Sequence, residues 1–206
     1  MVSTKAKPGT FEAERRVFRQ HGGVMRTQQA IDAGVHPRDL YAMRDCGVLE
    51  KLSRGVYRLT ELEPLSHPDL VTVAMRVPDG VVCLLSALAF HDLTTQVPHA
   101  VHLAIQRGSE APRVKHPPID LFWFGGKAFS SGIKTHELDN VPVRIYSPEK
   151  TLADCFKYRN KLGVDTAVEA LKLYAESGQT RADEIMRCAR ICRVANVMRP
   201  YLEAIL

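Results

Sequence analysis

The segment of residues 23–59 constrains the fold of this chain more than any other part of the sequence. A short helix is predicted over residues 27–33, with Thr27 as its amino-terminal cap. Gly34 supplies the positive φ angle that a sharp turn needs, and a proline suits the first position of a second helix over residues 37–46. Helix, tight turn and helix in this order predict a helix-turn-helix.

The second predicted helix has two different faces. Leu40 and Met43 are three residues apart and are expected to pack toward the first helix. Arg38, Tyr41 and Arg44 also recur every third residue, on the opposite face. This face is therefore predicted to enter a groove of DNA.

A basic hairpin follows the second predicted helix. Short strands are predicted over residues 49–52 and 56–59, around a three-residue loop at 53–55 in which glycine takes the left-handed position. The basic residues of this hairpin are Lys51, Arg54 and Arg58. A helix-turn-helix followed by such a hairpin has the element order of a winged helix-turn-helix.

The distribution of charge supports the same interpretation. Residues 1–60 carry 11 Lys and Arg against 6 Asp and Glu, whereas residues 61–206 carry 17 of each kind. The formal net charge of +5 therefore lies entirely in the first segment. A local basic excess on a winged helix-turn-helix favours binding to the phosphate backbone of double-stranded DNA, and a merely solvated basic face is the alternative.

Two kinds of DNA contact are predicted. Arg38 and Arg44 are long enough to offer paired donors to guanine edges in the major groove, and Tyr41 could contact a thymine methyl group or a phosphate. Tyr41 could instead cover the hydrophobic seam, and Arg58 could pair with Glu50 across the hairpin. The residues expected to contact phosphates are Arg26, Thr27, Lys51, Arg54 and Arg58.

The sequence changes character after the hairpin, and the predicted fold class is α+β. Residues 61–67 read as a polar, proline-containing linker, so a DNA-binding domain is assigned to residues 10–60 and a mixed α/β domain to residues 67–206. The latter is expected to end in about four helices. Its predicted strands cover residues 100–105, 119–124, 133–138 and 141–146, and its predicted helices cover residues 68–77 and 86–92, a segment from Pro148 capped by Ser147, and residues 165–177, 180–192 and 195–206.

Three motifs in succession carry a family resemblance. They are SRGVYRL at residues 53–59, LLSALAFHDLT at 84–94 and YSPEKTLADCF at 146–156. Together they resemble the AbiEi family of antitoxins from type IV toxin-antitoxin systems. The resemblance implies a winged helix joined to a mixed α/β antitoxin domain.

The resemblance also implies function. A member of this family would repress its own operon and neutralise a cognate nucleotidyltransferase-like toxin, with direct contact between the two proteins left open. Because one winged domain makes few base contacts, paired binding to an inverted repeat in the promoter is expected. The expected partners are therefore double-stranded DNA and the toxin.

Enzymatic activity is not expected, although two groups of polar residues invite the comparison. Ser86, His91 and Asp92 lack the glycine pattern of a nucleophile elbow. A metal-dependent nuclease of a phage-defence system, or a pure protein-interaction module, remains an alternative to the repressor. The carboxylates that such a nuclease would use are Asp120, Glu137 and Glu149.

No cofactor or metal is expected. The five cysteines include a pair four residues apart, Cys188 and Cys192, and are predicted to be reduced and structural rather than zinc ligands. The chain has neither a run of ~18 apolar residues nor a secretory leader, so a cytoplasmic protein is expected. A basic stripe in the last helices is expected to be solvated; it comprises Arg181, Arg187, Arg190, Arg193 and Arg199.

Overall fold

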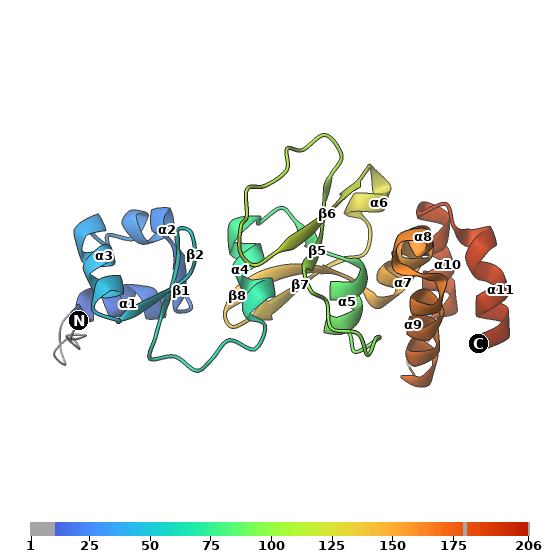
Figure 1. The fold of residues 1–206 in the computed structure, drawn as a ribbon, viewed down its shortest axis with the longest axis horizontal. Helices are drawn as coiled ribbons and strands as arrows, with labels where there is room; N and C mark the ends of the chain where they lie inside the picture. The colour runs from blue at the N-terminus through green and yellow to red at the C-terminus, as the bar shows by residue number, and fades with distance from the viewer. Residues whose placement is uncertain (1–10, 179–180, 206) are drawn as a thin grey trace. The chain divides into compact units, whose positions relative to one another are not determined.

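The computed structural model describes residues 11–178 and 181–205, and it divides into two compact units (Figure 1). The first unit runs to Pro78 and includes Glu137–Val143. The second comprises Asp79–His136 and the chain from Arg144 onward. The domain boundaries assigned from sequence, residues 10–60 and 67–206, stay a prediction.

The first unit is a helix-turn-helix with a three-stranded antiparallel sheet. The sheet order is β1-β3-β2, so the predicted hairpin gains a third strand. This strand, β1, was not predicted because three residues before a helix carry no alternating pattern. The elements are α1 (Glu12–Gln20), β1 (Val24–Arg26), α2 (Thr27–Asp32), α3 (Pro37–Asp45), β2 (Leu49–Ser53), β3 (Val56–Leu59) and α4 (Pro68–Arg76).

A small hydrophobic core holds the helix-turn-helix against its sheet. Leu40 and Met43 of α3 are fully buried in it, together with Phe18 of α1 and Tyr57 of β3. Burial of each such side chain stabilises the fold by about 1.5 to 3 kcal/mol. Gly34 has φ +94° between α2 and α3, as the predicted turn requires.

Two local predictions in the first unit were wrong. Thr27 is the first residue of α2 rather than its cap, because Arg26 still belongs to β1; the Gln29 side chain instead accepts a hydrogen bond from the Arg26 backbone N–H at 2.9 Å. The loop between β2 and β3 has two residues rather than three. Ser53 pairs with Val56 after an irregularity in β2, and this extends the strand by one residue.

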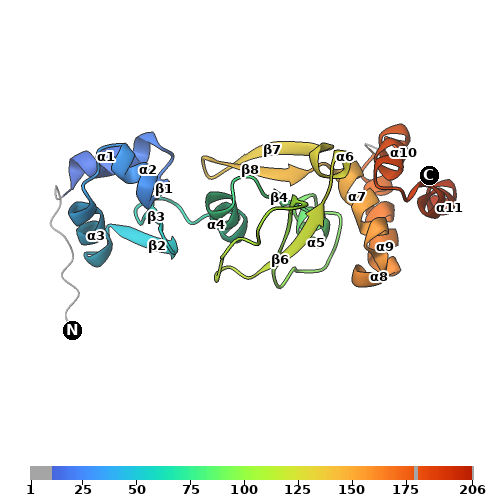
Figure 2. The same cartoon turned by 90° about the horizontal axis from the view of Figure 1, so that it is seen from above.

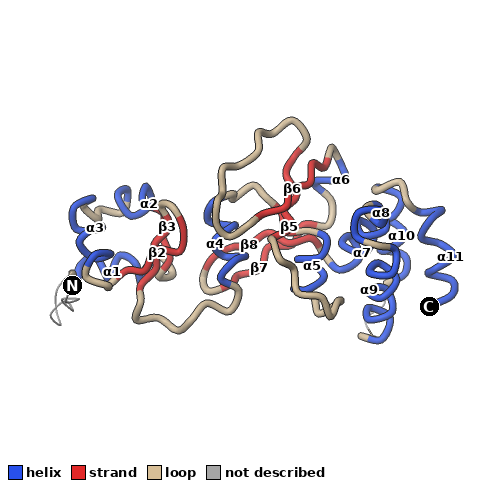
Figure 3. The backbone as a smooth tube through the Cα atoms, in the orientation of Figure 1, coloured by secondary structure: helices blue, strands red, loops and turns tan. Residues whose placement is uncertain are grey.

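The other sheet is mixed and has five strands in the order β6-β5-β4-β8-β7, of which the ends of β7 and β8 within Glu137–Val143 belong to the first unit. Strands β5 and β6 are parallel, β4 is antiparallel to β5, and β4 is parallel to β8. Figure 3 shows these strands in red, and the fold is the predicted α+β. The strands are β4 (Val81–Val82), β5 (Val101–Gln106), β6 (Ile119–Phe124), β7 (Ile133–Leu138) and β8 (Val141–Tyr146).

The chain after the sheet is helical, as predicted, with one additional short helix. Helices α7 to α11 pack against one another (Figure 2), and α5 packs on β5 and α7. The predicted start of one helix at Thr180 lies outside the described residues. The helices are α5 (Leu84–Phe90), α6 (Lys127–Ser130), α7 (Pro148–Lys157), α8 (Arg159–Leu162), α9 (Val164–Glu176), α10 (Ala182–Ile191) and α11 (Ala195–Ile205).

Helix α7 is unusual because its polar side chains from Glu149 to Asp154 are buried. Ser147 caps it by accepting a hydrogen bond from the Lys150 N–H at 3.4 Å. Lys150 is 0 % exposed and its Nζ lies 2.5 Å from Asp154 Oδ2. Glu149 is also buried and accepts a hydrogen bond from the Tyr174 hydroxyl at 2.9 Å. The core of the second unit therefore contains a buried ion pair between Lys150 and Asp154.

Candidate nucleic-acid interface

Helix α3 presents three polar side chains on its exposed face. The side chain of Arg38 is 83 % exposed and that of Arg44 is 37 % exposed, while Tyr41 is 42 % exposed. Tyr41 therefore does not cover the hydrophobic seam, which Leu40 and Met43 fill instead. The guanidinium carbon of Arg44 lies 5.2 Å from the centre of the Tyr41 ring, within the range of a cation–π contact.

The ion pairs of Arg38 and Arg44 within α3 are weak enough to be replaced by contacts to DNA. Arg38 Nε lies 3.4 Å from Asp39 Oδ1, and Arg44 Nε donates to Asp45 Oδ1 at 2.7 Å. Hydrogen bonding to Asp45 raises the pKa of Arg44, so this side chain keeps its positive charge. Exposed ion pairs of this kind contribute about 1 kcal/mol or less. Both guanidinium groups can therefore turn toward a DNA groove at little cost.

The start of α3 is fixed by a local cap. The His36 Nδ1 atom accepts a hydrogen bond from the Arg38 backbone N–H at 3.2 Å, and Pro37 occupies the first helical position. These contacts hold the backbone of Arg38 at the first turn of the helix. The amino-terminal turn of a recognition helix is the part that approaches base edges most closely.

The wing carries exposed cations at its tip and along β2. Lys51 and Arg54 are both exposed, and Gly55 beside Arg54 has φ +74°. The Thr27 backbone N–H donates to the Gly55 carbonyl at 2.9 Å, and its hydroxyl lies 3.5 Å from the same oxygen. Thr27 therefore ties the wing tip to the start of α2 and positions Arg54.

Arg58 is buried and is no longer a candidate for a phosphate contact. Its side chain is 6 % exposed, and its Nη1 atom donates to Glu50 Oε1 at 2.6 Å. The same guanidinium also donates to the Glu63 carbonyl. The alternative interpretation, pairing across the hairpin, is the correct one. The central strand β3 places this side chain inward, whereas the sequence pattern suggested an exposed wing position.

A third arginine near the wing was missed in the sequence. Arg76, at the end of α4, donates from Nη1 to the Arg54 carbonyl at 2.6 Å. Burial and the nearby charge of Arg76 lower the pKa of Arg26, so these two cations lie close together. Two like charges at one place favour an anion between them. No local motif could have shown this, since the residues come from β1 and α4.

The catalytic alternatives do not assemble in the second unit. Ser86 Oγ accepts a hydrogen bond from the His102 backbone N–H at 2.9 Å, and His91 Nε2 lies 2.7 Å from the Tyr146 carbonyl. Both side chains therefore support the local backbone and do not form a nucleophile–base pair. Burial lowers the pKa of His91, which keeps its ring neutral near pH 7.

Two of the three carboxylates considered for a nuclease, Asp120 and Glu149, have separate partners. Asp120 lies 3.6 Å from His102, and Glu149 is held by Tyr174 and by Arg181, whose Nη2 lies 2.8 Å away. In the described parts of the chain, residues 11–178 and 181–205, no three His, Cys, Asp or Glu side chains could hold a metal ion together. The five cysteines are free thiols. No helix in those same ranges is both long and apolar enough to cross a membrane.

Comparison with known proteins identifies a family match in the amino-terminal segment. Residues 12–60 match the family described as transcriptional regulator, AbiEi antitoxin, which confirms the resemblance for the segment that contains the motif SRGVYRL. No curated protein matches the chain.

The fold as a whole resembles that of a solved structure. The crystal structure of the RV2827C protein from Mycobacterium tuberculosis is similar with a TM-score of 0.61 at 12% sequence identity. The similarity covers 90% of this chain and 73% of that one. At this identity the likeness concerns the fold alone.

Proposed function

We propose that this chain, which carries an AbiEi-type transcriptional regulator domain at residues 12–60, represses its own operon and serves as the antitoxin of a type IV toxin-antitoxin system. The observation that supports the proposal most directly is the exposed face of α3. Arg38, Tyr41 and Arg44 lie outward on a helix whose opposite face is fully buried. A rigid helix with exposed paired donors suits direct readout of base edges in the major groove.

In this proposal α3 supplies sequence specificity. Arg38 and Arg44 each offer two N–H donors in one plane, which match the O6 and N7 acceptors of guanine. Tyr41 lies beneath the Arg44 guanidinium and would contact a thymine methyl group or restrict the arginine to one orientation. Each paired contact to a base would discriminate against other bases by about 1 to 3 kcal/mol.

The wing and its neighbours supply affinity that does not depend on sequence. Lys51 and Arg54 would contact phosphates flanking the groove, and Arg26 would add a third contact beside the start of α2. Thr27 remains a candidate for a phosphate contact, though its hydroxyl faces the wing carbonyl. Each cation that displaces a counterion increases the salt dependence of binding.

Paired binding on DNA follows from the small size of one winged domain. A single recognition helix reads few base pairs, which is too little to distinguish one operator in a genome. We therefore propose that two copies bind an inverted repeat in the promoter, with half-sites about one helical turn apart. The protein would act in the cytoplasm, where this DNA lies.

The antitoxin role is assigned to the second unit. The proposed target is a nucleotidyltransferase-like toxin encoded beside this gene, neutralised by contact or by opposing its effect. Co-expression of the toxin with the Arg38→Ala/Arg54→Ala variant tests this separation. Growth should recover although repression is lost. Persistent growth arrest with the unsubstituted chain would contradict the antitoxin role.

A binding titration tests the DNA-binding role. Fluorescence anisotropy would compare the chain's own promoter fragment with a scrambled fragment of equal composition, at about 50 and 200 mM salt. The promoter should bind at least about a thousand times more tightly. Equal affinity for the two fragments would refute the repressor, and cleavage of either fragment in Mg²⁺ would favour the nuclease alternative.

Two variants assign the contacts. Arg54→Ala should weaken both fragments alike and reduce the slope of log K against log salt by about 1. Arg16→Ala, an exposed arginine on α1, serves as the matched control and should leave promoter preference unchanged.

A further inference from the structure

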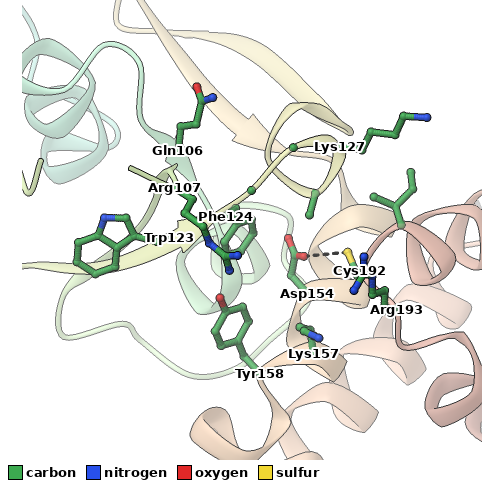
Figure 4. Close-up of a pocket in the computed structure, with 14 residues that line it drawn as sticks. Gln106, Arg107, Trp123, Phe124, Lys127, Asp154, Lys157, Tyr158, Cys192 and Arg193 are labelled. Atoms are coloured by element: carbon green, nitrogen blue, oxygen red, sulfur yellow. Dashed lines mark hydrogen bonds between the residues drawn. The ribbon is translucent and has the colours of Figure 1, made fainter. Parts of the chain in front are cut away.

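The second unit contains a cavity of about 780 Å³ where strands β5 and β6 end (Figure 4). These strands are parallel, and their last residues, Gln106 and Phe124, face one another across the pair. Both residues line the cavity. The carboxyl ends of parallel strands are the usual place for ligands in open α/β sheets, and this volume falls within the range of small-molecule sites.

Four cations from separate elements line this cavity. Arg107 follows β5, Lys127 begins α6, Lys157 ends α7 and Arg193 follows α10. All four side chains are exposed, and none forms an ion pair with a residue of the 11–178 and 181–205 segments. Their charges are therefore not neutralised by neighbouring carboxylates.

The one carboxylate that lines the cavity is already bound. Asp154 accepts from Lys150 Nζ at 2.5 Å and from the Cys192 thiol at 3.2 Å. Figure 4 draws the contact between Asp154 and Cys192 at the inner wall. Because this acid is compensated by a buried lysine, the cavity keeps the positive potential of its rim.

Aromatic rings provide the other half of the site. Trp123 is 42 % exposed, and its indole N–H donates to the Ser109 carbonyl at 3.2 Å, which fixes the ring. Tyr158 stacks on Phe124 with ring centres 5.7 Å apart. Figure 4 shows Trp123 on one side of the cavity, with Cys192 and Arg193 on the other. An exposed planar ring near unpaired cations suits a ligand with an aromatic base and phosphates.

The backbone at Arg193 gives independent support. The residues after α10 form a Schellman motif, in which the N–H of Arg193 binds the Arg190 carbonyl and the N–H of Val194 binds the Ala189 carbonyl. The first of these positions is usually glycine, yet here an arginine adopts φ +59°. A left-handed arginine in place of glycine is costly to folding, and such strain is typical of functional sites.

We infer that this cavity binds a nucleoside polyphosphate. Arg107, Arg193 and Lys157 hold the phosphate oxygens by charge-assisted hydrogen bonds, and the base stacks on Trp123. Lys127 extends outward at the rim and adds long-range attraction. The inference concerns the second unit alone and does not depend on the DNA-binding role of the first.

The chain's single tryptophan reports on the cavity directly. Titration with ATP or GTP should quench the fluorescence of Trp123 in a saturable manner and produce a matching heat in calorimetry. Adenosine should bind at least about 10-fold more weakly, and pyrophosphate should compete without quenching. Absence of saturable quenching and of binding heat at millimolar nucleotide would overturn the inference.

Three variants separate a ligand site from a solvated basic surface. Arg107→Ala/Arg193→Ala should weaken nucleotide binding at least about 10-fold, whereas Arg199→Ala, an exposed arginine of α11, should not. Arg193→Gly should raise Tm and still weaken nucleotide binding, which a structural role for Arg193 does not predict. Equal affinity in all three variants, or binding of a single-stranded RNA oligomer without binding of mononucleotides, would refute the site.

Discussion

Helices α3 and α7 have the same kind of start, but α3 exposes its charged side chains and α7 buries most of its own. Each has proline at its first position and a side chain that accepts a hydrogen bond from an early backbone N–H, from His36 in α3 and from Ser147 in α7. Helix α3 then exposes its arginines, whereas α7 buries Lys150 and Asp154. A start signal therefore locates a helix but does not say whether its charges face water or the core.

The difference lies in what surrounds each helix. Helix α3 has one packed face, so its polar residues remain in solvent and are free for a ligand. Helix α7 is packed against α5, α9, α10 and α11, so its charged residues Glu149, Lys150 and Asp154 are buried and have partners inside the protein. The comparison predicts that the buried charges of α7 govern stability and the exposed charges of α3 govern DNA binding.

The largest expected effect tests the buried pair of α7. Lys150→Ala leaves Asp154 buried without its ammonium partner, and loss of one member of a buried pair costs about 3 to 5 kcal/mol. Urea denaturation monitored by circular dichroism measures this change. The double variant Lys150→Met/Asp154→Leu should recover most of the loss because no charge is left unpaired. If Lys150→Ala is as stable as the unsubstituted chain, the buried charges of α7 do not govern stability and the proposed difference from α3 is refuted.

The next effect tests the exposed face of α3. Arg38→Ala should weaken promoter binding by about 1 to 3 kcal/mol, while the free energy of unfolding changes by no more than about 0.5 kcal/mol. Anisotropy and urea denaturation of the same preparation measure both. A large loss of stability with unchanged DNA affinity would reverse the assignment of the two helices.

The two caps provide a smaller comparison. Ser147→Ala should destabilise the second unit by about 1 kcal/mol, because the Lys150 N–H lies in a buried helix start and loses its acceptor. His36→Ala should cost less, since the Arg38 N–H is exposed and water can replace the imidazole. Thermal unfolding of the two variants measures the difference, and a larger cost at His36 would contradict it.

The smallest effect is the acid sensitivity of α7. Burial opposes ionisation of Glu149, but hydrogen bonds from its own backbone N–H, Ser147 and Tyr174, with the charge of Arg181, leave its pKa below the ordinary 4.5. The unfolded chain therefore binds a proton more readily, and the stability from this group is complete above pH 4.5 and lost as pH falls below it.

A pH series tests that sensitivity. Urea denaturation from pH 6 to pH 3.5 should show a steeper decline for the unsubstituted chain than for Glu149→Gln, which cannot titrate. Identical declines would show that Glu149 gains nothing from its buried position.

Much of the fold could be predicted because its signals are local. Gly34, the proline starts of α3 and α7, and the apolar strand Ile119–Phe124 each act within a few residues, and all lie where expected. The short connection between the predicted strands 133–138 and 141–146 is equally local, and its two residues, Asp139 and Asn140, both have positive φ. These features depend on backbone sterics and on the short-range alternation of apolar and polar residues, both of which can be recognised in the sequence.

The features that escaped prediction depend on distant parts of the chain. The sequence predicted Arg58 as an exposed wing residue. It is buried because β1 pairs with β3, which makes β3 the central strand of the sheet. Arg76 approaches Arg54 only through tertiary packing, and the cations of the cavity come from four separate elements. Sequence periodicity indicates which face of a single helix or strand is buried, but it does not show which other element packs against that face.

The three-stranded wing has a consequence for the operator itself. Because β1 leads without a break into α2 and Thr27 fastens the tip of the loop, the tip cannot slide relative to the helix-turn-helix. In the proposed DNA complex, the spacing between the bases that α3 contacts and the phosphates that the wing contacts would therefore be fixed. One inserted base pair would displace that phosphate by about 3.4 Å and rotate it around the duplex, so the proposed complex would discriminate half-site length as well as base sequence.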